Sequence, residues 1–168
     1  MPEKATLERA RKAKREGKAP STQAGEFVRE EIEHVREGKH GARSAKQAIA
    51  IGLSKARRAG VKLPPPKEGA AVSARTRRQA ARDYLKGQQG IEKPSPKRSR
   101  ATLKALQREG HEAASEIALS RQAHRSARQR GPKKRSLAAQ KAIRTKGKAG
   151  LQQAARKAAR TRHLKVGR

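Results

Sequence analysis

Three arginines near the middle of the chain have the spacing that places side chains on one face of a helix. Arg121, Arg125 and Arg128 stand at positions i, i+4 and i+7, which are neighbours on a helix surface. A second basic row lies near the carboxyl end and consists of Arg156, Lys157 and Arg160. Cationic groups in such rows can follow a phosphate backbone. We therefore expect both rows to bind phosphates, and the alternative is a face that is only solvated.

Two short basic motifs are similar to peptides that enter the minor groove of DNA. Ser95-Pro96-Lys97-Arg98 resembles the Ser-Pro-basic-basic motifs of histone tails, in which a compact turn presents two cations. Arg130-Gly131-Pro132-Lys133-Lys134-Arg135 is similar to an AT-hook. Pro132 replaces the second arginine of the usual centre, and this weakens insertion into the groove. For both motifs, a groove contact and a solvated basic linker remain alternatives.

A further candidate interface is the predicted helix that follows Ser44. If it were the recognition helix of a helix-turn-helix, Gln47 would contact adenine, and cationic side chains would contact phosphates. Those cations are Lys46, Arg57 and Arg58. A helix-turn-helix normally has a third helix that closes its core, and none is evident from the sequence. We therefore expect the basic tail, rather than this helix, to bind most strongly.

The sequence predicts no catalytic residue, no metal site and no cofactor. His111-Glu112-Ala113-Ala114-Ser115 begins like a zinc-binding HExxH helix, but Ser115 occupies the place of the second histidine. His34 lies near Phe27 and is expected to be structural. The remaining carboxylates of interest form a predicted outer stripe that solvates its helix: Glu26, Glu30, Glu33 and Glu37. We therefore expect a protein that is not an enzyme.

The overall charge is the strongest feature of the composition. Lys and Arg number 45 against 14 Asp and Glu, which gives a net charge of +31 over 168 residues. Such a charge attracts polyanions. Apolar residues make up 33%, with one Phe, one Tyr and no Trp, so we expect long stretches to be disordered in isolation. Cysteine is absent, which excludes disulfides. Neither a signal peptide nor a membrane span is predicted.

Periodicity predicts one folded unit, an αα-hairpin over residues 24–63. Its first helix ends at Gly38-Lys39-His40-Gly41, and its second begins at the capping box Ser44-Ala45-Lys46-Gln47. Small residues along the second helix, including Gly52, allow close packing of the two helices. The predicted hairpin core consists of Val28, Ile32, Val35, Ile49, Leu53 and Ala56.

The predicted fold class is mainly α, without β-sheet. We expect a basic arm over 1–20, the amphipathic hairpin over 21–63, and a Pro/Gly-containing linker over 64–100. Within the linker, Ser73 and Gly87 delimit a short helix over 73–86. Residues 101–168 form an Ala/Lys/Arg-rich tail that is helical or disordered, with Gly110 dividing its first helix.

Part of the hairpin resembles a known family. The residues that carry the resemblance are Glu26-Phe27-Val28 through Gly38-Lys39, followed by 44–60 with the core Lys46-Gln47-Ala48-Ile49-Ala50-Ile51. They look like a bacterial family of short basic proteins, a domain of unknown function for which DNA binding is expected. That resemblance implies no catalytic residues. The tail is similar in composition to the histone-H1-like tails of bacteria.

These observations favour a histone-like, nucleoid-associated protein of the cytoplasm that binds duplex DNA largely without sequence preference. An RNA- or ribosome-associated basic protein is an alternative, although aromatic stacking platforms are nearly absent. Another alternative is a hairpin that binds a protein partner or a second copy of the chain while the tails hold nucleic acid.

Overall fold

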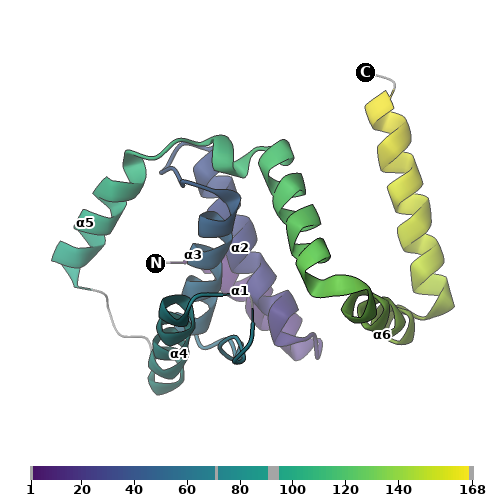
Figure 1. Ribbon diagram of the computed structural model, residues 1–168, viewed down its shortest axis with the longest axis horizontal. Coiled ribbons are helices and arrows are strands. Elements are labelled where there is room, and N and C mark those ends of the chain that lie inside the picture. Colours follow the sequence, from purple (N-terminus) through teal and green to yellow (C-terminus); the bar gives the residue numbers. More distant parts are fainter. Residues whose placement is uncertain (1, 71, 91–94, 167–168) are drawn as a thin grey trace. The chain divides into compact units, whose positions relative to one another are not determined.

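The computed structural model is mostly helical and describes residues 2–70, 72–90 and 95–166 (Figure 1). No strand occurs in these ranges, which confirms the predicted all-α class. The elements are α1 (Lys4–Arg15), α2 (Pro20–Arg36), α3 (Ala45–Arg58), α4 (Ala74–Gln89), α5 (Pro96–Gln107), the short 3-10 helix η1 (Glu112–Ala114) and α6 (Glu116–Val166). The chain divides into two compact units, Met1–Ala123 and His124–Arg168.

Helices α2 and α3 form the predicted hairpin. The hydroxyl of Ser44 accepts a hydrogen bond from the backbone N–H of Gln47 at 3.2 Å, which confirms the N-cap. The Gln47 side chain in turn accepts from the N–H of Arg43 at 2.9 Å. After α2, Gly38 adopts a φ of 73°, the left-handed conformation that ends many helices.

The two hairpin helices are in backbone contact at Gly52. A Cβ added there would lie 2.6 Å from the Cα of Val28 and 2.9 Å from the carbonyl oxygen of Phe27. Only glycine permits this separation without displacement of α2. The expectation that small residues on the second helix allow close packing is therefore confirmed at this position.

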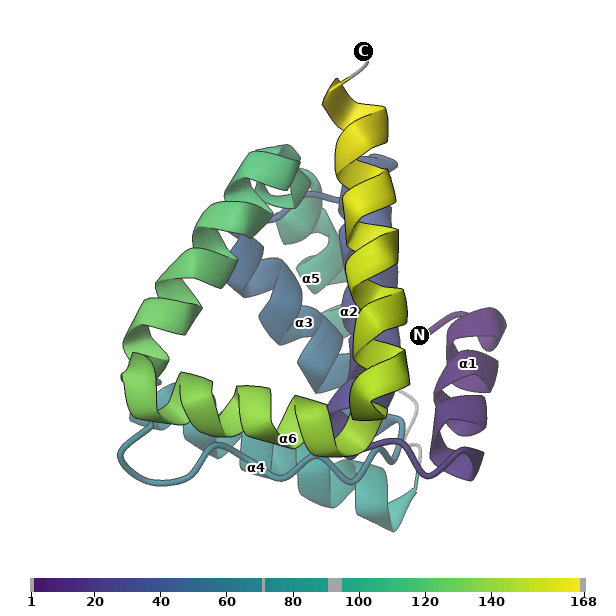
Figure 2. The ribbon, with the colours of Figure 1, turned by 90° about the vertical axis from the view of Figure 1, so that its right-hand side faces the viewer.

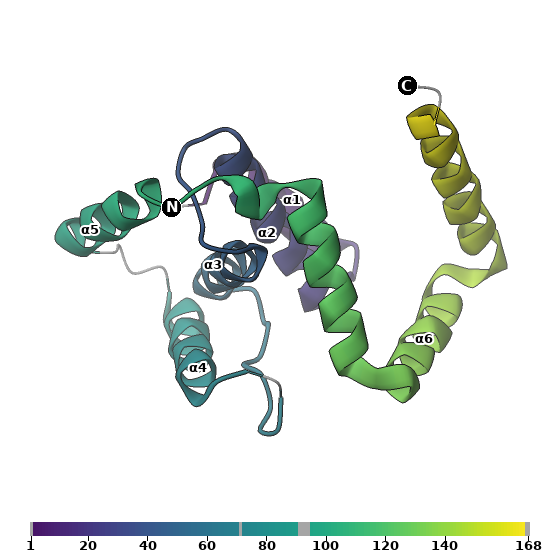
Figure 3. The same ribbon diagram turned by 45° about the horizontal axis from the view of Figure 1, so that its top comes forward.

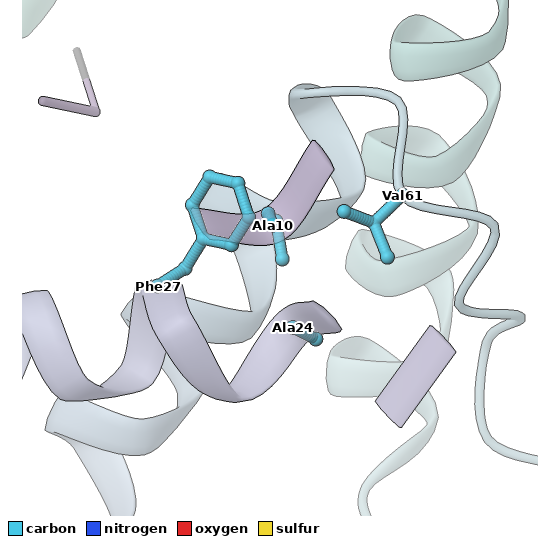
Figure 4. Packing of buried hydrophobic residues seen from close by; sticks show 5 residues of the cluster. Ala10, Ala24, Phe27 and Val61 are labelled. Atoms are coloured by element: carbon cyan, nitrogen blue, oxygen red, sulfur yellow. The ribbon is translucent and has the colours of Figure 1, made fainter. Parts of the chain in front are cut away.

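The larger hydrophobic cluster is closed by α1 (Figure 4). Phe27, only 1% exposed, packs in a cluster of buried residues that come from α1, α2, α3 and the segment after α3: Ala10, Ala24, Ala56 and Val61. Figure 2 shows α1 alongside α2. Residues 1–20 are thus not simply a basic arm, because they contain α1, a third helix that is not evident from the sequence. Periodicity within 24–63 could not reveal a helix outside that window.

A second cluster lies where η1 packs against α2 and α3 (Figure 3). Its members are small apart from Val35: Ala42, Ala48, Ala113 and Ala114. Of the predicted hairpin core, Val35 and Ala56 are buried, while Ile32 and Leu53 pack half-buried against the two clusters. The other two, Val28 and Ile49, are half-buried.

Helix α4 begins as predicted but ends later. Ser73 caps it through a 3.1 Å hydrogen bond from the N–H of Thr76. The helix does not stop at Gly87, and it continues to Gln89. A Cβ at Gly87 would collide with the carbonyl oxygen of Arg57, so this glycine permits close packing of α4 on α3 rather than ending the helix.

Beyond α5, the predicted division of the chain near Gly110 is present, because α5 ends at Gln107 and α6 begins at Glu116. Inside α6 the backbone leaves helical geometry at Gly131 and Gly147, where φ is 72° and 64°. Where the sequence predicts a tail that is helical or disordered, the structure is helical. None of the side chains described over 116–163 is buried, so this helix contributes no side chain to a hydrophobic core.

We predict that Gly52→Ala destabilises the protein by about 1–3 kcal/mol, because the added methyl group overpacks the contact between α2 and α3. The matched control is Gly25→Ala in α2, where an added Cβ meets nothing within 4 Å. Alanine there should be neutral or stabilise by up to about 1 kcal/mol. Urea unfolding followed by circular dichroism measures both, and equal effects would contradict the proposed close contact.

Candidate functional site

Positive charge is distributed differently in the two units. All 14 acidic residues precede residue 117, whereas residues 124–168 contain 16 Lys and Arg without a single Asp or Glu. The ion pairs found among the described residues accordingly lie within the first unit, and they involve ten of its basic and histidine side chains: Arg9, Lys18, Arg29, His34, Lys39, His40, Arg43, Lys55, Arg58 and Arg77.

The structure places the predicted cations of α6 on its surface. Those exposed are Arg121, Arg125, Arg128, Arg130, Lys133, Lys134, Arg135, Arg156, Lys157 and Arg160. Within the part of the chain that is described, none of them pairs with a carboxylate. The first arginine row stands on the uninterrupted helical stretch before Gly131, so its spacing does place the three groups on one face. The arrangement presents repeated cations to solvent.

The two basic motifs for which a DNA-groove contact is predicted lie at the starts of helical segments. Pro96 is in the first turn of α5, directly after the N-cap Ser95, and Lys97 and Arg98 are exposed. Pro132 follows the break at Gly131 in the same way. Proline is favoured at a helix start because its missing N–H has no helical partner there. The cations of both motifs therefore project from helical turns.

Most of the polar groups proposed for a recognition helix on α3 are engaged within the fold. Arg57 is buried, and its Nε donates to the carbonyl oxygen of Leu63 at 3.2 Å; this burial lowers the pKa of the guanidinium. Arg58 Nε lies 2.8 Å from Asp83 Oδ1. The Gln47 side chain accepts a hydrogen bond from Arg43 at the start of the helix. Of the four predicted groups, only Lys46 is exposed without a contact of this kind among the described residues. Helix α3 thus offers little for base contacts.

The carboxylate of Asp83 joins α4 to α3. It is 1% exposed and accepts hydrogen bonds from Ser54 at 2.7 Å, Arg58 at 2.8 Å and Gln79 at 3.0 Å. Sequence reasoning missed this residue. Its signal is that Asp83 is the only acidic residue between Glu68 and Glu92, where a lone carboxylate among basic side chains indicates a specific partner.

The expected outer stripe of glutamates is partly wrong. Glu30 is buried at 2% exposure and its neighbour Glu31 at 0%, whereas Glu26 and Glu33 are half-buried and Glu37 is exposed. The Glu30 carboxylate is buried beside two partners that the predicted apolar faces of the hairpin do not include. The backbone N–H of Glu3 donates to its Oε2 at 3.1 Å, and Lys55 Nζ lies 3.5 Å from its Oε1.

Glu31 and two histidines come together beside this pair. Lys55 Nζ lies 2.6 Å from Glu31 Oε2, and His40 Nε2 lies 3.3 Å from Glu31 Oε1. Neither oxygen of Glu31 receives a well-oriented hydrogen bond. One potential ligand atom each from Glu31, His34 and His40 lies within 4.8 Å of the others. The sequence analysis predicted no such grouping, because His40 comes from the turn after α2.

The exposed edge of this cluster is formed by Glu3. Its Oε1 lies 2.8 Å from His34 Nε2 and 3.2 Å from Lys39 Nζ. The hydrogen bond with His34, followed by the one with Lys39, lowers the pKa of the Glu3 carboxyl. Glu3 therefore links the start of α1 to the end of α2.

Comparison with known proteins identifies one region. Residues 6–67 match the model of a family of unknown function, DUF6496. This region extends from within α1 through α3 and contains the cluster around Glu31, whereas the cationic segment of 124–168 lies outside it. No curated protein and no solved structure matches the chain. Among the described helices, none has the length and apolar character needed to cross a membrane.

We predict that Asp83→Ala lowers the free energy of unfolding by about 1–3 kcal/mol, because three donors lose their acceptor. Glu68→Ala is the matched control. Its carboxylate is 92% exposed and pairs only with Arg77, so a change below about 0.5 kcal/mol is expected. Urea unfolding followed by the fluorescence of Tyr84, the chain's only tyrosine, provides the measurement, and comparable losses would contradict the role of Asp83.

Proposed function

We propose that this protein binds duplex DNA without catalysis and largely without sequence preference, through phosphate contacts made by α6. The observation that carries the proposal is the unbalanced charge of residues 124–168, with 16 basic residues and no acidic one. Most of these cations are exposed on helical turns. Duplex DNA carries about one negative charge per 1.7 Å of its axis. A polyanion of that density supplies the neutralising charge that the unit itself lacks.

The aromatic residues support duplex over single-stranded binding. Phe27 is buried in the core and Tyr84 is half-buried on α4, so neither provides the exposed stacking platform on which single-strand binders rely. Phosphate contacts carry no sequence information by themselves. The proposal accordingly places the protein on DNA as a histone-like, nucleoid-associated component of the cytoplasm.

The acidic side chains of α2 argue against the alternative of a hairpin that docks a protein partner through an outer glutamate stripe. Glu30 and Glu31 point into the fold and lie close to Lys55. What remains accessible of the stripe is Glu37 with the half-buried Glu26 and Glu33. Glu26 and Glu33 pair with Arg9 and Arg29, which lowers the net charge of that face.

We predict a steep salt dependence of binding to duplex DNA. If about eight phosphates are contacted, affinity should fall by roughly three to five decades between 50 and 200 mM salt. Fluorescence anisotropy with two unrelated duplexes of equal length measures the slope and the preference together. A slope near zero, or a preference above about 1000-fold for one duplex, would contradict phosphate-driven binding. Tighter binding to double-stranded RNA than to either DNA duplex would favour the RNA-associated alternative.

We also predict that the position of the charge matters. Replacing Lys133, Lys134 and Arg135 by glutamine should reduce the slope of log affinity against log salt by up to ~2.7, since each lost phosphate contact removes about 0.9. The matched control replaces Lys12, Lys14 and Arg15 at the end of α1 and removes the same charge from the first unit. It should change the slope less. Equal losses would show that net charge alone, and not α6, determines binding.

A further inference from the structure

The cluster at the carboxyl end of α2 contains a buried carboxylate whose charge is incompletely compensated. Glu31 is fully buried, yet its two oxygens receive no well-oriented hydrogen bond. A buried carboxylate without full compensation is costly, because burial removes the water that would solvate it. Lys55 lies at Oε2, 2.6 Å away, so the uncompensated oxygen is Oε1. The group that faces Oε1 is His40.

His40 is oriented like a metal ligand. Its Nδ1 lies 3.1 Å from the carbonyl oxygen of Gly41, a pairing that requires the proton on Nδ1 because a carbonyl can only accept. In a neutral ring, Nε2 then carries a lone pair and faces the carboxylate at 3.3 Å. Two acceptors in that position need a proton or a metal ion between them. Metal-bound histidines typically donate their other ring N–H to a backbone carbonyl or a carboxylate in this way.

His34 supplies a second nitrogen from the same helix as Glu31. Residues i and i+3 lie on one face of a helix, and His34 is beside His40 with the two rings at 6.1 Å and nearly perpendicular. Its Nε2 is held by the carboxylate of Glu3 at 2.8 Å, which is the other common outer partner of a metal-bound histidine.

The spacing of the three potential metal-ligand atoms suits a small divalent ion. Ligand atoms about 2.0–2.2 Å from a tetrahedral Zn²⁺ are roughly 3.3–3.6 Å apart. The Glu31 to His40 distance of 3.3 Å already has this value, and the three potential ligand atoms lie within 4.8 Å of one another. On binding, the ion would draw the remaining pairs from within 4.8 Å to that separation.

The net charge of the side chains around the site also favours a divalent cation. The carboxylates linked through these contacts are Glu3, Glu30, Glu31 and Glu37, and the lysines among them are Lys39 and Lys55. These four carboxylates and two lysines sum to a net charge of −2, within a chain whose total is +31. A divalent ion cancels that excess.

We propose that Glu31, His34 and His40 bind a divalent transition-metal ion, with Zn²⁺ as the best match to two imidazoles and one carboxylate. The ion ties the end of α2 to the turn before α3, against which residues 106–110 pack through the hydrogen bonds from Gly41 to Leu106 and from Ala42 to Gly110. Binding to the folded state alone makes Zn²⁺ raise the stability of the protein. The site is independent of the proposed DNA contacts of α6.

The test uses the full-length protein, treated with a chelator and then titrated with Zn²⁺ by calorimetry and with Co²⁺ by visible absorption. We expect one ion per chain and a higher unfolding temperature with Zn²⁺. His34→Ala and His40→Ala should each weaken binding at least tenfold, as should the isosteric Glu31→Gln. The matched control is His124→Ala on α6, outside the cluster, and it should leave binding unchanged.

A measurement on the unsubstituted protein covers the case in which a variant does not fold. Paramagnetic Co²⁺ should broaden the ring signals of His34 and His40 in NMR spectra before those of His111, His124 and His163. Uniform broadening of all five, binding weaker than about 1 mM, or binding that survives both histidine substitutions overturns the proposal. In that event an imidazolium of His40 paired with Glu31 is the cation at this position.

Discussion

The first unit depends on how closely its helix backbones approach one another. With one Phe, one Tyr and no Trp in 168 residues, few large side chains are available to fill the space between helices at ordinary separation. Gly52 brings α3 onto α2, and Gly87 brings α4 onto α3. The two hydrophobic clusters, which join α2 and α3 to α1 and to η1, are built largely from alanines around Phe27 and Val35. When the helix backbones lie this close, small side chains can make the dispersion contacts that larger ones would otherwise supply, since these contacts require atoms within about 4 Å of one another.

Close packing also explains where the acidic side chains are used. Helices that approach through small residues bring polar groups on their flanks into contact, and each buried group must then find a partner. Asp83 meets three donors from α3 and α4, and Glu30 and Glu31 meet Lys55. Acidic residues of the first unit therefore hold its helices together. The unit over 124–168 has no acidic residues, so its cations stay available for an external polyanion.

The two proposals differ in which charged side chains lack an internal partner. DNA binding rests on cations that have no carboxylate partner in the described part of the chain, and the metal site rests on carboxylates that exceed their cations. The first is a property of an exposed, repetitive surface, where screening by salt governs the strength. The second is a property of a buried cluster, where geometry governs the strength. One chain can have both because they lie in different units.

The sequence alone determined whatever depends on neighbours along the chain. The caps at Ser44 and Ser73, the small residue at Gly52, the inward positions of Val35 and Ala56 and the exposed cations of α6 all follow from local hydrogen bonding, helical periodicity or charge. The tertiary structure decided which helix meets which. The contribution of α1 to the core, the inward turn of Glu30, the internal pairing of Arg58 and the meeting of Glu31 with His40 join residues from separate elements. Periodicity within one helix specifies a face but not the partner that covers it, and a polar side chain is buried at low cost only where its surroundings supply a hydrogen bond or an opposite charge.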